Sequence, residues 1–172
     1  MESITLMDFI LAQQPDLGND KNKDKQESAA ETIENNIRKK VVERLVINPA
    51  YYGKMSEILE KLIEDRRNGV LAYGELLDRY MELAKNVTRP EENSRYPESI
   101  RKSRALQTLY DNCGEDEMQA LRLHKAITKA KMDGFRNNPV KENKIKRALY
   151  QILKDEDEVE RIYQIVIEQE EY

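Results

Sequence analysis

The chain has 172 residues and a formal net charge of −4 at pH 7, with 39% hydrophobic and 36% charged residues. This length gives room for one domain. The low counts of six glycines and five prolines argue against a loop-rich β-sandwich. No apolar run approaches the roughly 20 residues that span a bilayer, and the N-terminus lacks the basic start of a signal peptide. Cys113 is the only cysteine, so we expect no internal disulfide, no membrane contact and a reducing, cytoplasmic location.

The first 27 residues are expected to form a short helix and a flexible linker. Ser3 is a suitable N-cap for a helix that ends near Gln13, and the polar stretch after it has too few apolar residues to fold by itself. The main domain is predicted over residues 28–172. It begins where Ser28 and Glu31 form an S-x-x-E capping box, in which each side chain satisfies a free backbone N–H group.

Apolar residues recur at helical spacing through the rest of the chain. Asn48-Pro49 and Asn138-Pro139 are typical helix starts, and Gly69 is suited to end a helix in the left-handed conformation. A short connection at Gly69 predicts an antiparallel helical hairpin. The helices are expected over residues 28–46, 48–68, 71–86, 97–111, 116–131, 138–153 and 155–170. No stretch alternates with a period of two, so the sequence predicts an all-α fold, a compact bundle of six or more helices with few or no strands.

The sequence offers little for catalysis. None of the glycines lies in a phosphate-binding loop, and Cys113 and His124 cannot form a zinc site alone. Asp133, Glu142 and Lys144 follow the D…E-x-K order of metal-dependent nucleases, but those residues normally lie on neighbouring strands. Here they fall at helix ends, where a glutamate also favours the helix dipole. We therefore predict no catalytic, cofactor-binding or metal-binding residue and keep a small hydrolase as a minor hypothesis.

Tyrosine and charge suggest surfaces for partners. Adjacent helical positions differ by about 100°, so one residue of the Tyr51–Tyr52 pair is expected to be exposed. A basic cluster surrounds Tyr96, in a predicted loop and helix start where partner contacts are common. The candidate partner contacts are Tyr51, Arg95, Tyr96, Arg101, Lys102 and Arg104.

A second basic stretch, residues 122–147, is followed by an acidic one, residues 155–171. The favoured interpretation is that basic helices pack beside an acidic helix and the charges neutralise each other. The alternative is a basic face for nucleic-acid phosphates or for an acidic protein. In that case the candidate phosphate contacts are Lys125, Lys129, Arg136, Lys141 and Lys144.

Several strings resemble a known family. "AAETIENNIRKKVVERLVINPAYYGKMSEILEKLIEDRR" is similar to the carboxyl-terminal region of the restriction (R, motor) subunit of type I restriction–modification enzymes. That region has strings of the type A-E-T-I-E-N-N-x-R and N-P-x-Y-Y-x-K-M-S-E. "DGFRNNPVKENKIKRALYQIL" and "IYQIVIEQEEY" resemble its closing segment, so the resemblance covers the chain from about Ala29 to Tyr172.

The resemblance implies a role that is larger than this chain. Such R subunits carry a nuclease domain and two ATP-driven motor domains, and they translocate and cleave DNA while bound to modification and specificity subunits. This sequence has no Walker motif or helicase box, so it resembles the helical tail alone. ATP and Mg²⁺ would act in the absent domains. The implied function is non-catalytic docking onto the methyltransferase core, with DNA as a second contact; the alternative is a stand-alone helical DNA-binding module that uses residues 122–147.

Overall fold

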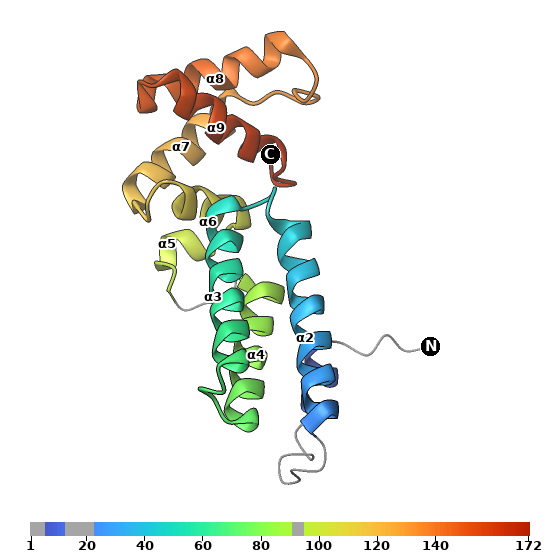
Figure 1. The fold of residues 1–172 in the computed structure, drawn as a ribbon. Coiled ribbons are helices and arrows are strands. Elements are labelled where there is room, and N and C mark those ends of the chain that lie inside the picture. Colours follow the sequence, from blue (N-terminus) through green and yellow to red (C-terminus); the bar gives the residue numbers. More distant parts are fainter. Residues whose placement is uncertain (1–5, 13–22, 91–94) are drawn as a thin grey trace. The chain divides into compact units, whose positions relative to one another are not determined.

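The computed structural model describes residues 6–12, 23–90 and 95–172. Over these ranges the chain forms helices and no strand (Figure 1), which confirms the predicted all-α fold. The helices are α1 (Leu6–Ala12), α2 (Lys23–Arg44), α3 (Pro49–Arg67), α4 (Tyr73–Thr88), α5 (Glu98–Arg101), α6 (Arg104–Asn112), α7 (Glu117–Ala130), α8 (Pro139–Leu153) and α9 (Glu156–Ile167). None of the described helices has the length and apolar character that a membrane span requires.

The helices belong to two compact units. Unit 1 is formed by Met1–Leu45 and Tyr52–Asn93, and unit 2 by Val46–Tyr51 and Ser94–Tyr172. The sequence predicted one domain over residues 28–172, and the structure divides this range differently. The division follows the helix pairing, because α1, α2 and α4 pack with one another, whereas α5 to α9 pack mainly with their neighbours in the chain.

The start of α2 differs from the prediction. The helix begins at Lys23, so Ser28 lies inside it and its carbonyl accepts a hydrogen bond from Thr32 Oγ1 at 2.9 Å. The predicted capping box at Ser28 is therefore wrong, and so is the linker over residues 23–27. Lysine, glutamine and glutamate form helices well, and Asp24 in the first turn favours the helix dipole. Ser3 and residues 13–22 lie outside the described residues.

Unit 1 has a core built from one face of each helix. Ile10 of α1 is fully buried, and α1 packs against α2 and α4. The other buried apolar residues recur at the spacing of an amphipathic helix. They are Ala30, Ile33, Ile37 and Val41 of α2, Tyr52, Met55, Leu59, Leu62 and Ile63 of α3, and Leu76, Leu77, Tyr80, Leu83, Ala84 and Val87 of α4.

Both predicted ends of α3 are confirmed. Asn48 Oδ1 accepts a hydrogen bond from the Tyr51 N–H at 3.2 Å, and Pro49 is the first helical residue. Gly69 has φ +65°, a conformation that glycine adopts without steric cost, and the Val70 N–H bonds back to the Asp65 carbonyl at 2.9 Å. After this turn α4 runs in the opposite direction, as the hairpin prediction required (Figure 1).

Unit 2 begins with an interruption that the sequence analysis did not predict. The helix expected over residues 97–111 is split into α5 and α6. Ser103 adopts an extended conformation between them and its hydroxyl accepts the Leu106 N–H at 3.1 Å, so it is the N-cap of a new helix. The later helix starts are as predicted: Asp116, Asn138 and Asp155 cap α7, α8 and α9.

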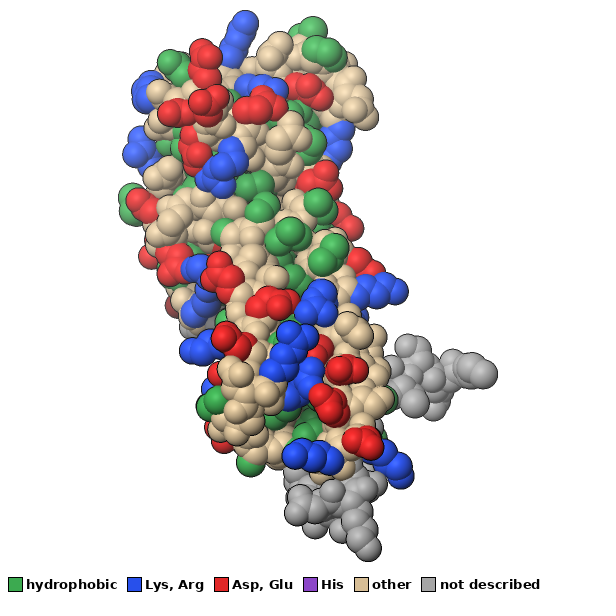
Figure 2. Space-filling model, viewed as in Figure 1, with side chains coloured by type: hydrophobic (Ala, Val, Ile, Leu, Met, Phe, Trp, Pro, Cys, Tyr) green, Lys and Arg blue, Asp and Glu red, His purple; other side chains and the backbone are tan. Residues whose placement is uncertain are grey.

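The core of unit 2 lies among α5 to α9. Its buried members include Tyr96, Ile100, Leu106, Leu109, Leu123, Ile127, Phe135, Ile145, Leu149, Ile162, Tyr163, Val166 and Tyr172. Met118 of α7 lies outside this core and is 68% exposed. Figure 2 shows acidic and basic side chains interspersed over the visible face of the described chain, with apolar side chains between them.

Candidate functional site

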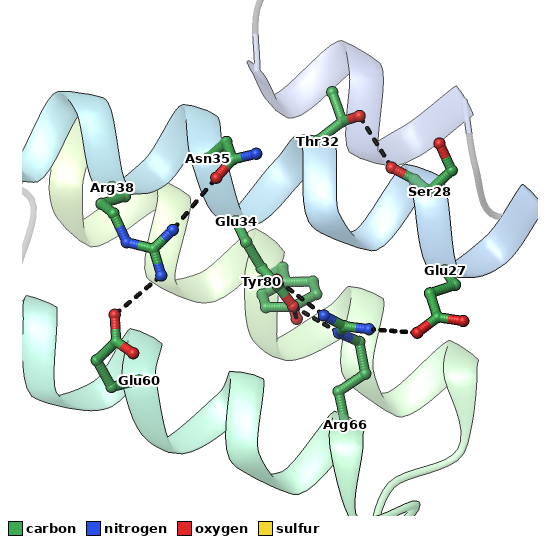
Figure 3. A network of polar contacts seen from close by, with 9 residues as sticks. All are labelled: Glu27, Ser28, Thr32, Glu34, Asn35, Arg38, Glu60, Arg66 and Tyr80. Atoms are coloured by element: carbon green, nitrogen blue, oxygen red, sulfur yellow. Dashed lines mark hydrogen bonds and ion pairs between the residues drawn. The ribbon is translucent and has the colours of Figure 1, made fainter.

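The first polar cluster, the Glu34 cluster, lies in unit 1. Glu34 of α2 is only 4% exposed. Arg66, in the last turn of α3, donates from Nε to Glu34 Oε1 at 2.7 Å and from Nη2 to Oε2 at 3.1 Å. The Tyr80 hydroxyl of α4 donates to the same Oε1. Figure 3 shows these side chains converging, with Glu27 beside Arg66. One carboxylate therefore joins three helices.

The surroundings keep Arg66 charged and Tyr80 protonated in the Glu34 cluster. The hydrogen bond that Arg66 donates to Glu34 raises the pKa of Arg66, so the guanidinium stays charged. Burial, together with the hydrogen bond to Glu34, raises the pKa of Tyr80 far above its ordinary value. A tyrosine that keeps its proton can donate a hydrogen bond to a carboxylate, and Tyr80 therefore acts as a structural hydrogen-bond donor.

The second cluster, the Asp111 cluster, lies in unit 2. Asp111 of α6 is 6% exposed. Its Oδ2 accepts from Asn48 Nδ2 at 2.8 Å and from the Tyr96 hydroxyl at 2.7 Å, while the Arg95 guanidinium pairs with Oδ1. Arg95 also lies over two aromatic rings, 5.0 Å from the Tyr51 centroid and 4.8 Å from that of Tyr96, where cation–π attraction is favourable. The cluster joins the first turn of α3 to α6 and to the segment before α5.

Burial and the neighbouring groups also shift the pKa values of Tyr96 and Arg95 in the Asp111 cluster. Burial, followed by the charge of Asp111, raises the pKa of Tyr96. Burial alone would lower the pKa of Arg95, but the Tyr96 hydrogen bond and the Asp111 charge raise it above the ordinary value.

The structure changes the interpretation of the tyrosine candidates. Tyr51 is fully buried and Tyr52 is 4% exposed, so the expectation that one of them is exposed was wrong. The two residues face different elements: Arg95 lies over Tyr51, whereas Arg44 Nη1 donates to the Tyr52 hydroxyl at 3.4 Å. Tyr96 is 1% exposed. The side chains of Tyr51 and Tyr96 therefore build the interior and offer no surface to a partner.

Arg101, Lys102 and Arg104 are exposed and remain predicted partner contacts. Arg101 Nε donates to the Tyr96 carbonyl at 2.9 Å. The Arg104 N–H donates to the Glu171 carboxylate at 2.7 Å, so a carboxylate caps the start of α6, as the helix dipole favours. Lys102 is the simplest of the three to change without disturbing a contact.

The candidate phosphate contacts fall into two groups. Arg136 donates to the carbonyls of Ile167 and Gln169 at 2.8 and 2.5 Å, and Lys141 Nζ donates to the Asp133 carbonyl at 2.6 Å. These two side chains hold unit 2 together. Lys125, Lys129 and Lys144 are exposed. On α7, Arg122, Lys125 and Lys129 are spaced by three and four residues and share one exposed face.

Among the described residues, one ion pair joins the basic stretch to the acidic helix. Lys146 Nζ of α8 lies 2.6 Å from Glu160 Oε2 of α9. The acidic helix also pairs internally, through Arg161 and Glu158. Neutralisation is therefore local, and many charges on both helices point to solvent.

The nuclease-like residues form no metal site. In the described part of the chain no three His, Cys, Asp or Glu residues lie close enough to hold a metal ion. Glu142 Oε1 instead accepts the Asn137 N–H at 3.0 Å, and Lys144 Nζ lies 3.4 Å from Met132 Sδ. These contacts shape the turn before α8.

His124 is expected to make the stability of the chain depend on pH. Its Nδ1 lies 2.6 Å from the Tyr172 hydroxyl. Burial lowers the pKa of His124, with Glu171 opposing and Lys131 adding to the effect. Because the folded pKa is below the unfolded value of about 6.5, the unfolded chain takes up the proton first. Stability should fall as the pH drops below about 6.5 and should level off below the folded pKa.

We predict that His124→Gln reduces this acid-side loss. The measurement is the free energy of unfolding in urea at about pH 7.5 and pH 5.5, on either side of the ordinary histidine pKa. The difference between the two pH values should be smaller in the variant than in the wild type. An equal difference in both proteins would show that His124 does not contribute.

Cys113 is predicted to be an unreactive thiol. Burial raises its pKa from 9.0 to about 11. At pH 8 the native chain should therefore hold roughly a hundredfold less thiolate, the reactive species, than an ordinary thiol. Reaction with an aromatic disulfide reagent should be slow in buffer and fast in urea. Equal rates in both would contradict the assignment.

No protein-family model matches this sequence, and searches of curated proteins and of solved structures give no significant match. The class of this protein is therefore defined by its fold and its two polar clusters. It is a helical protein of two units, and a buried carboxylate holds the helices of each unit together.

Proposed function

We propose that this chain is a helical docking module of the kind that the R subunits of type I restriction enzymes carry at their carboxyl end. In this role it holds the motor and nuclease domains of such a subunit against the modification and specificity subunits. The proposed partners are thus the modification and specificity subunits. The ATP and Mg²⁺ chemistry is proposed to take place in the motor and nuclease domains.

The observation that carries the proposal is the place of the resembling strings in the fold. Glu34 lies in the E-T-I-E-N-N string, Asn48 and Tyr51 lie in N-P-x-Y-Y-x-K-M-S-E, and Arg66 lies in the charged end of the same helix. These residues take part in the two buried clusters, whose other members are Tyr80, Arg95, Tyr96 and Asp111. The resembling strings therefore include residues that fasten the helices together, which supports a shared scaffold.

The docking surface must then lie on the exposed residues of that scaffold. In unit 2 these include Lys102 of the α5–α6 connection and the large apolar side chains of Met118 and Val140, which are 68% and 72% exposed. Exposed apolar and cationic side chains of this kind are available to a protein partner.

A pull-down against a modification–specificity complex tests the proposal. The wild-type chain should be retained, and exchange of the exposed charges by Lys102→Glu with Lys125→Glu should reduce retention. Arg95 and Tyr96 are unsuitable as probes, because their loss would open the Asp111 cluster. Glu75→Lys on α4, an exposed residue of unit 1, is the control. A folded wild-type chain that is not retained would overturn the proposal.

A second function, DNA binding, is favoured by the shared face of Arg122, Lys125 and Lys129 on α7. If all three contact phosphates, the logarithm of affinity should fall with the logarithm of salt with a slope of about −2.7. Fluorescence anisotropy of a labelled duplex measures this slope. Lys125→Glu with Lys129→Glu should remove most of it, and a duplex that does not bind at low salt would exclude this function.

A further inference from the structure

The outer surface of α8 and α9 contains a groove with walls of opposite charge. The two helices pack side by side (Figure 1) and are joined through Lys154, which adopts a left-handed conformation. The groove has a volume of about 360 Å³. Lys146, Arg147 and Tyr150 line its α8 side, and Glu156, Val159 and Glu160 line its α9 side.

The charges of the two walls are only partly satisfied within the chain. Lys146 and Glu160 pair with each other across the groove at 2.6 Å. Arg147 and Glu156 are both exposed, and neither forms an ion pair with a described residue. The α8 wall therefore keeps a free positive charge and the α9 wall a free negative charge.

Between these charges, Val159 and Tyr150 give the groove apolar surface, and the polar side chains of Asn143 and Gln151 complete the lining. Val159, at its base, is 6% exposed, and Tyr150, at its edge, is 41% exposed. Tyrosine and arginine are the side chains most often enriched at the centre of protein interfaces. The surface thus has an apolar centre that a partner can cover, between two edges of opposite sign.

From this arrangement we propose that the α8–α9 groove is a self-association surface, and that its occupant is a second copy of the same chain. A two-fold axis through the groove would bring the α8 wall of one copy against the α9 wall of the other. In such an isologous contact each residue pair occurs twice. Arg147 of each copy would face Glu156 of the other, and the two Tyr150 rings would cover the apolar centre.

The opposite charges of the two walls favour a second copy of the chain over a partner of uniform charge. An acidic peptide or a phosphate backbone would meet attraction at Arg147 and repulsion at Glu156. Like charges placed together are costly at an interface, whereas a second copy meets attraction at both edges. The contact is small, so the dimer should be weak and should dissociate as salt rises.

Charge reversal and sedimentation equilibrium test the proposal on the full chain. The wild type should show a monomer–dimer equilibrium at low salt. Arg147→Glu alone and Glu156→Arg alone should each weaken dimerisation by about tenfold, since the substitution acts twice in the dimer. The double variant exchanges the two free charges and leaves the Lys146–Glu160 pair in place, so it should regain most of the wild-type affinity.

The controls separate this surface from a general effect of charge. Arg122→Glu on α7 makes the same charge change away from the groove and should leave the dimer unchanged, and circular dichroism should show that every variant is folded. A wild type that stays monomeric at millimolar concentration would overturn the proposal. Two further results would overturn it: a dimer affinity that neither single charge reversal changes, or a double variant that dimerises as weakly as the single variants.

Discussion

Replacing Arg66 with methionine should lower the free energy of unfolding of unit 1 by about 3–5 kcal/mol, the range for a buried ion pair that loses one partner. Arg66 and Glu34 have side-chain exposures of 11% and 6%. Without the guanidinium, the Glu34 carboxylate keeps the Tyr80 hydroxyl as a donor but loses the opposite charge. The measurement is urea unfolding followed by far-UV circular dichroism.

Two controls identify the cause of this loss. Arg79→Met removes an exposed pair with Glu75, whose members are 52% and 51% exposed, and should cost no more than about 1 kcal/mol. Replacing the whole cluster, by Glu34→Leu, Arg66→Met and Tyr80→Phe together, should recover most of the stability, because no buried polar group is then left unpaired. Equal effects of Arg66→Met and Arg79→Met would contradict the role given to the Glu34 cluster.

Replacing Asp111 with alanine should destabilise unit 2 by about 3–5 kcal/mol, for the same reason. Three donors, on Asn48, Arg95 and Tyr96, lose their acceptor at once. Asn48 also caps α3, so the first turn of that helix should loosen. Hydrogen exchange of the α3 amides, together with urea unfolding, measures both effects.

Glu115→Ala is the matched control for Asp111→Ala. Glu115 also faces Arg95, at 3.7 Å, but its side chain is 46% exposed, against 2% for Asp111. The expected cost is about 0–1 kcal/mol. If the two substitutions cost the same, burial would not be what makes Asp111 important.

Helix positions followed from the sequence where a capping residue stands before a clean apolar stripe. The starts of α3, α7, α8 and α9 are of this kind, because capping and periodicity act over a few neighbouring residues. The predicted helix start at Ser28 was wrong, because the polar residues before this serine are themselves helical. The start of α6 at Ser103 was missed, because this serine lies within a continuous apolar pattern. Both serines resemble caps, and only tertiary packing distinguishes them.

The two polar clusters could not be predicted in the same way. Asn48 and Asp111 are 63 residues apart in the chain, and no local pattern shows that they meet. Glu34 did leave a signal, since it lies between Ile33 and Ile37 on the buried face of α2. A carboxylate in an apolar stripe requires a buried partner, but the sequence does not say that Arg66 and Tyr80 supply it.

The candidate contact residues show the same limit. Arg136 and Lys141 look like surface cations in the sequence, yet they donate to backbone carbonyls that only the fold brings near. Tyr51 looked half exposed because the sequence does not show that both sides of the α3 start are covered. Charge and residue type identified the exposed Lys102, Lys125 and Lys129, but not which of them meets a partner.

Competition with a complete type I restriction enzyme tests the docking proposal most directly. If this chain is the module that fastens an R subunit to its methyltransferase core, an excess of the folded chain should displace that subunit. ATP-dependent DNA cleavage should then fall as the chain is titrated in, while methylation by the core continues. Unchanged cleavage at saturating amounts of folded chain would contradict the account.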